Sequence, residues 1–144
     1  MVEQDTIKLL RECDAGVRMG IDSFDDVLDY VREEALKRRL TDCKKEHEAL
    51  EKEINAQLKQ YHDQGKDPNP VAKGMSWVKT NVMLAVKESD ATIADLMTDG
   101  CNMGVKSLSK YLNQYKAAEE KTKDIAKRLI SLEERLAVDI RGYL

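Results

Sequence analysis

Apolar residues recur at alternating steps of three and four along most of the chain. That spacing places them on one face of an α-helix, so each helix buries one side. No stretch alternates with a period of two, as a strand would, and the pattern therefore predicts an all-α protein. The clearest stripes are Ile7, Leu10, Asp14, Val17, Ile21, Phe24, Leu28 and Val31; Leu36, Leu40, Cys43, His47, Leu50, Ile54, Leu58 and Tyr61; and Ala118, Thr122, Ile125, Leu129, Leu132, Leu136, Ile140 and Tyr143.

Cap and turn signals give the helix boundaries. Asp5 or Thr6 can cap the first helix, because their side-chain oxygens accept hydrogen bonds from unpaired backbone amides. A segment that contains Gly65, Pro68 and Pro70 ends the second helix and is the strongest linker signal in the chain. The predicted helices are about residues 5–31, 34–62, 70–115 and 117–141.

The third helix carries a weaker pattern. It is predicted to start near Pro70, a favoured first-turn residue, and to be interrupted or kinked within residues 88–104. Ser89 and Asp90 mark a break, because their side chains compete for backbone hydrogen bonds. Gly100 and Gly104 share a face, and they indicate either a close helix contact or a local end or kink. The apolar positions before the break are Val71, Met75, Trp77, Val78, Val82, Leu84 and Ala85.

Chain length and connection lengths together predict the architecture. The 144 residues fit a single domain, residues 1–144, which can bury a core without disulfides or metals. Short turns between long helices favour antiparallel neighbours. The sequence therefore predicts an antiparallel up-down-up-down four-helix bundle.

Charge and composition narrow the range of partners. Lys and Arg total 24 against 27 Asp and Glu, for a net charge of −3. Nucleic-acid binding needs a dense basic face, and acidic residues flank the one short basic run, Lys37-Arg38-Arg39, so we expect no nucleic acid. We expect no membrane association either, because no apolar run reaches ~18 residues. The N-terminus lacks the pattern of a secretion signal, and the three cysteines are scattered without metal-binding spacing. The chain is thus predicted to be cytoplasmic.

Three polar residues, Asp14, Cys43 and His47, fall inside the apolar stripes. Cys43 and His47 are four positions apart and so share a helix face. In an antiparallel pairing of the first two helices, Glu51 lies closer in depth to Asp14 than His47 does. One hypothesis is a mononuclear metal site formed by Asp14 and His47 with Cys43 or Glu51, a donor set that suits zinc. The other, which the sequence favours, is a neutral buried His47 hydrogen-bonded to Asp14.

The order of several local stretches resembles the ferritin-like superfamily, and most closely a small bacterial family of ferritin-like proteins of unknown function known by the domain label DUF2383. The stretches are LRECDAGVRMG (residues 10–20), LKRRLTDCKKEHEALEKEINAQL (36–58), GMSWVK (74–79), GCNMGVKSLSKY (100–111) and the closing helix around Leu132-Glu133-Glu134. The resemblance implies a four-helix bundle that, in metal-loaded relatives, holds two metal ions among inward carboxylates and histidines.

The sequence departs from that metal-binding pattern. Lys44 stands three residues before His47 where Glu is required, and Ala137 stands three residues after Glu134 where His is required. Gly100-Cys101-Asn102 occupies the region in which metal-binding relatives offer Glu. The resemblance and these departures together predict a non-catalytic binding or structural module without a cofactor. Such a module could form a homodimer or bind a protein partner. The alternative is an iron- or zinc-binding protein of oxidoreductase or storage type.

Overall fold

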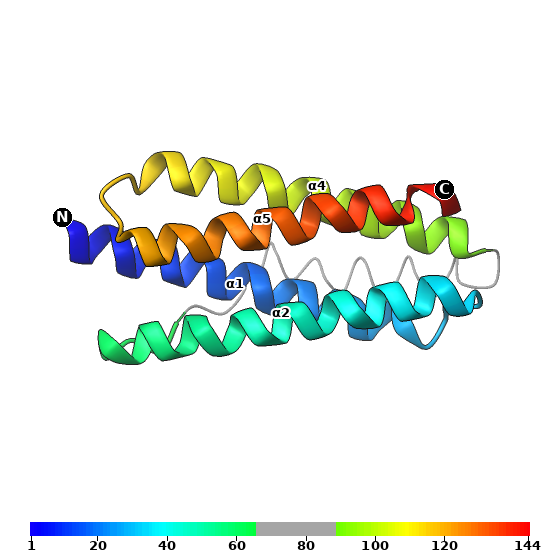
Figure 1. Ribbon diagram of the computed structural model, residues 1–144, viewed down its shortest axis with the longest axis horizontal. Coiled ribbons are helices and arrows are strands. Elements are labelled where there is room, and N and C mark those ends of the chain that lie inside the picture. Colours follow the sequence, from blue (N-terminus) through cyan, green and yellow to red (C-terminus); the bar gives the residue numbers. More distant parts are fainter. Residues whose placement is uncertain (66–88) are drawn as a thin grey trace.

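The computed structural model describes residues 1–65 and 89–144. These residues form four α-helices: α1 (Val2–Leu28), α2 (Glu34–Gln60), α4 (Asp90–Gln114) and α5 (Glu120–Ile140), followed by a short 3₁₀ turn, η2 (Arg141–Tyr143). The helices lie side by side as a bundle, and no strand occurs in the described ranges (Figure 1). The predicted all-α four-helix fold is confirmed at this level. The first half of the predicted third helix, residues 70–88, lies outside the described residues.

The helix directions differ from the predicted alternation. α1 and α5 run in one direction along the bundle, while α2 and α4 run in the other (Figure 1). The described helices therefore run up, down, down, up, and the predicted up-down-up-down order does not hold for them. The prediction assumed a short connection before the third helix, but the segment between α2 and α4 has more residues than α2 itself. Only short turns favour antiparallel neighbours, so the rule behind the prediction does not apply to α2 and α4.

The predicted buried face is correct for α2 and α5 and incomplete for α1. In α2 the buried side chains are those of the predicted stripe from Leu36 to Leu58, and in α5 they run from Thr122 to Ile140 as expected, with Ala126 added. In α1 the core also takes Leu9, Cys13 and Val27. This helix packs against α2, α4 and α5, so it buries a wider face than a single stripe.

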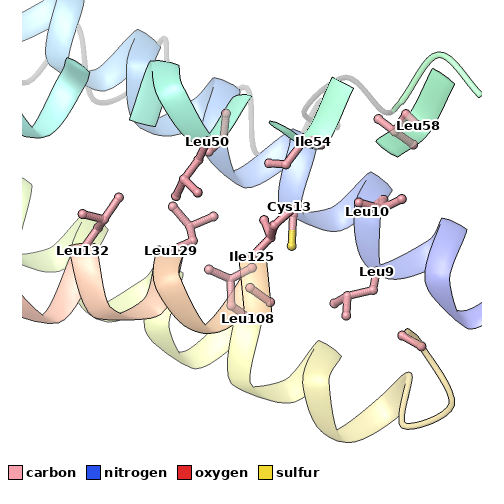
Figure 2. Packing of buried hydrophobic residues seen from close by; sticks show 13 residues of the cluster. Leu9, Leu10, Cys13, Leu50, Ile54, Leu58, Leu108, Ile125, Leu129 and Leu132 are labelled. Carbon is pink, nitrogen blue, oxygen red and sulfur yellow. The ribbon is translucent and has the colours of Figure 1, made fainter. Parts of the chain in front are cut away.

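The buried apolar side chains form two clusters along the bundle. Around the middle and one end of the bundle, leucine and isoleucine side chains from all four helices converge, with Cys13 of α1 among them (Figure 2). A second cluster at the other end is formed around Phe24 of α1 and Leu40 of α2, both at most 1% exposed. Truncation of such a side chain to Ala costs ~2–5 kcal/mol in similar cores, so these clusters supply the main stabilisation of the bundle.

Asp5 and Thr6 do not cap α1. The helix begins at Val2, with Met1 as its N-cap and no side-chain cap bond. Asp5 instead accepts a hydrogen bond from the backbone N–H of Ala117 (3.0 Å), and Thr6 Oγ1 accepts one from Glu119 N–H (2.9 Å). Both oxygens therefore satisfy amides at the start of α5, because the two helix ends meet at the same end of the bundle.

Asp90 has the equivalent role at the opposite end. Its two carboxylate oxygens accept hydrogen bonds from the backbone N–H groups of Arg32 (2.9 Å) and Glu33 (2.8 Å), just before α2. Asp90 is also the first residue of α4, and Ser89 before it has extended backbone. The helix thus begins where the sequence predicts a break, and its first side chain ties α4 to the start of α2.

The two glycines of α4 do not end the helix. The helix runs through Gly100 and Gly104 to Gln114. A Cβ at Gly100 would have no atom within 4 Å, while one at Gly104 would lie 3.6 Å from the Glu133 side chain. The predicted close helix contact is therefore absent at Gly100, and the predicted local end is absent at both positions. Within the described part of the chain, no helix is both long and apolar enough to cross a membrane.

Candidate functional site

His47 is the most constrained polar side chain of the core. It lies on the inner face of α2 and is 0% exposed. Its Nδ1 is 2.8 Å from the backbone carbonyl oxygen of Cys43, one turn earlier. A carbonyl oxygen can only accept, so Nδ1 carries a proton and donates it. This bond fixes the orientation of the ring and directs Nε2 across the bundle toward α5.

Glu133 of α5 meets the other ring nitrogen. Its Oε1 lies 2.7 Å from His47 Nε2, a distance typical of a charge-assisted hydrogen bond. Burial by itself would lower the pKa of His47, but the hydrogen bonds to Cys43 and Glu133 and the charge of Glu133 outweigh it and raise this pKa to about 10. At neutral pH the His47 ring is therefore an imidazolium that faces Glu133.

Two residues of α1, Phe24 and Gly20, pack against the imidazole ring of His47. Phe24 contacts the ring edge-to-face, with centroids 5.2 Å apart and an interplanar angle of 72°. Gly20 leaves the space that the ring fills, because a Cβ there would lie 3.0 Å from Cδ2 and 3.1 Å from Nε2 of His47. A larger residue at position 20 would push the ring away from α1.

Two thiols complete the buried cluster. Cys43 Sγ lies 3.7 Å from His47 Nδ1, and Cys101 of α4 lies near Glu133. Burial, followed by the charge of Glu133 and the interaction of the thiol with its side chain, raises the pKa of Cys101 well above the ordinary thiol value, against the opposing charge of Arg39. The Cys101 thiol is therefore protonated at neutral pH, and a protonated thiol is a poor nucleophile and metal ligand.

Asp14 lies in a different environment. Its carboxylate is fully buried and forms an ion pair with Arg18, one turn along α1, at 3.2 Å. Gly65, in the turn after α2, passes so close that a Cβ there would overlap the Asp14 carboxylate. Both ring nitrogens of His47 bind other groups, Cys43 and Glu133. The interpretation of His47 as a histidine hydrogen-bonded to Asp14 is thus replaced by a pairing with Glu133.

The structure brings together only part of the predicted site. Cys43 and His47 are adjacent, as their spacing predicts. Glu51 lies one turn further along α2 and is half-buried. Glu133 and Cys101 were missed, although Glu133 directly follows the stripe residue Leu132. The local sequence signal for Glu133 is that a charged residue stands next to a stripe residue. Many exposed charged residues have the same position, so this signal does not identify a site residue.

The donor set does not fit the two-metal centre that the family resemblance implies. Beside the His47–Glu133 pair, α1 contributes Gly20, which has no ligand atom in its side chain, and α4 contributes Gly104 and the thiol of Cys101, but no carboxylate. In residues 1–65 and 89–144, no group of three or more His, Cys, Asp or Glu side chains is arranged to hold a metal ion. The metal assignment to Asp14, Cys43, His47 and Glu51 therefore stays a prediction.

Comparisons of the chain with protein families, curated proteins and solved structures find no match. The resemblance to ferritin-like proteins accordingly stays a prediction from the sequence. The function of the chain has to be inferred from the contacts and burial of the described residues.

Proposed function

We propose that this chain is a ferritin-like four-helix bundle that acts as a non-catalytic binding or structural module. The observation that carries the proposal is the pairing of His47 with Glu133. A general base or a metal ligand needs a free lone pair, and both nitrogens of His47 are engaged with oxygen acceptors. The histidine of the core is thus committed to holding helices together.

The cysteines support the same proposal. Burial is the main cause that raises the pKa of Cys13 to about 12, and it also raises that of Cys101. Because the thiolate is the reactive form, these buried thiols are inert at neutral pH. Reduced, buried thiols are typical of cytosolic proteins, and we propose a cytoplasmic location on this ground.

The first test is the metal content of untagged protein purified from cells grown with added iron, zinc and manganese. We expect far less than one equivalent of each metal per chain, and the same thermal unfolding curve with and without a chelator. One equivalent of iron or zinc that survives purification would reject the proposal.

The second candidate is a metal-binding protein for iron or zinc, of storage or oxidoreductase type. The observation that favours it is that sulfur, nitrogen and oxygen atoms from three helices lie near one another, namely those of Cys43, His47, Cys101 and Glu133. Metal binding would require His47 and Glu133 to separate. Under this hypothesis, His47→Ala and Glu133→Ala each abolish metal uptake while helicity by circular dichroism is retained, and unchanged uptake rejects it.

A non-catalytic module acts through what it binds, and we propose a second copy of the chain or another protein as its partner. Sedimentation analysis over a range of concentrations tests the first option directly. A concentration-dependent shift from monomer to dimer supports self-association, whereas a monomer at all concentrations restricts the proposal to a different protein.

A further inference from the structure

We propose that an imidazolium–carboxylate pair, formed by the buried His47 and the partly buried Glu133, takes the place of a metal ion as the link between α2 and α5. In metal-binding helical bundles a cation is held between side chains that project from facing helices. Here one proton lies between a nitrogen of α2 and an oxygen of α5. This inference goes beyond the proposed module, because it states how the polar interior is held together.

The distance between the two groups supports a proton and not a metal. His47 Nε2 and Glu133 Oε1 are 2.7 Å apart. Two ligands of one tetrahedral zinc ion, each about 2.0–2.1 Å from the metal, lie roughly 3.3 Å from each other. The observed separation is that of a charge-assisted hydrogen bond. A metal ion could enter only after the two side chains had moved apart.

The surroundings leave Glu133 as the group that balances the charge on His47. Among residues 1–65 and 89–144, the groups near the pair are Cys43 and the more distant Arg39 on α2 and Cys101 on α4, while α1 presents the uncharged Phe24 and Gly20. Arg39 is itself paired with Asp139 at 2.6 Å. A buried imidazolium without an anion would be strongly destabilising, so His47 and Glu133 depend on each other.

The pair is one of a series of links between α2 and α5, and it is the least exposed ion pair among them. Gln57 accepts a hydrogen bond from the Thr122 hydroxyl (2.8 Å), and Arg128 donates to Glu53 (2.8 Å). These links follow one antiparallel register, and the ion pairs among them are exposed. Exposed ion pairs contribute little to stability, whereas loss of one partner from a buried pair is costly. Among the ion pairs of this series, His47–Glu133 is therefore the one whose loss should cost most.

The test combines one variant pair with a direct measurement on the wild-type chain. Glu133→Gln keeps the shape of the side chain but removes its charge, and Glu134→Gln changes the exposed neighbour on the same helix. We expect Glu133→Gln to lower the melting temperature by roughly 5–10 °C and Glu134→Gln to leave it unchanged. In the wild-type chain, ¹⁵N NMR of the imidazole should show protons on both nitrogens at pH 7, and one equivalent of Zn²⁺ should leave these signals unchanged.

Two results would overturn the inference. One is an unprotonated Nε2 in the wild-type spectrum, and the other is a shift of the His47 signals on addition of one equivalent of Zn²⁺. If Glu133→Gln does not fold, the wild-type spectrum still decides. The proposed function can fail independently: metal bound elsewhere on the chain would contradict the metal-free module but would leave the His47 signals in place.

Discussion

Gly20 and His47 lie in direct contact across the α1–α2 interface, and the contact depends on the absence of a side chain at position 20. A Cβ there would be 3.0 Å from His47 Cδ2 and 3.1 Å from Nε2. The ring has little freedom to move away, because its two nitrogens are bound to Cys43 and Glu133. Gly20 is therefore part of the polar site, although it contributes no polar atom.

This contact predicts opposite effects for two glycine substitutions in the same helix. A Cβ added at Gly16 would have no atom within 4 Å, so Gly16→Ala should stabilise the protein by up to ~1 kcal/mol through helix propensity. In Gly20→Ala the new Cβ would clash with the His47 ring, and the clash should cancel the gain in helix propensity. We expect this variant to be ~1–3 kcal/mol less stable than Gly16→Ala. Urea unfolding of the two variants measures the difference, and equal stabilities would show that His47 can shift at little cost.

The raised pKa of His47 predicts a loss of stability at alkaline pH. The pKa is 6.5 for an ordinary histidine and about 10 in the folded chain. A group with a raised folded pKa stabilises fully below the unfolded value, and the contribution is lost as pH rises toward the folded value. The free energy of unfolding should therefore fall between about pH 6.5 and 10.

The control for this pH dependence is Glu133→Gln, because other groups also titrate above pH 9. The difference in unfolding free energy between wild type and variant should shrink as pH rises through the same window. A constant difference from pH 6 to 10 would mean that the charge of Glu133 does not stabilise the imidazolium.

The turn after α2 offers a stabilising substitution. His62 has a φ of 56°, and the backbone N–H groups of His62 and Asp63 donate to the carbonyls of Lys59 and Leu58. This is the hydrogen-bond pattern of a Schellman motif, in which glycine is the favoured residue at the left-handed position. His62→Gly should raise the free energy of unfolding by about 0.5–1 kcal/mol, whereas His62→Ala should not. A destabilised glycine variant would show that the histidine side chain itself contributes.

The sequence predicted the features that depend on one helix at a time. The stripes of α2 and α5 are correct because each helix buries one face, and the pairing of Cys43 with His47 follows from their spacing. Glu133 and Gly20 were missed because they meet His47 from other helices. Contacts between helices depend on depth and rotation within the bundle, which periodicity does not specify.

The direction of α4 shows the same limit at a larger scale. The pattern from Ile93 to Leu108 marks a buried helix face, and both residues are in the core. Nothing in that periodicity distinguishes a helix that runs parallel to α2 from one that runs antiparallel. The number of residues between α2 and α4 allows either direction as well.

Asp90 provides a last test, on how the ends of the bundle are held. Its carboxylate accepts the backbone N–H groups of Arg32 and Glu33, so Asp90→Ala should leave both amides without this acceptor and cost ~1–2 kcal/mol, as loss of a helix cap does. Asp99→Ala, at an exposed position of the same helix, is the matched control and should have little effect. Hydrogen exchange localises the change: the amides of Arg32 and Glu33 should exchange faster in Asp90→Ala alone. Unchanged exchange at these two amides would mean that solvent replaces the carboxylate at no cost, and that α4 is positioned by its apolar contacts.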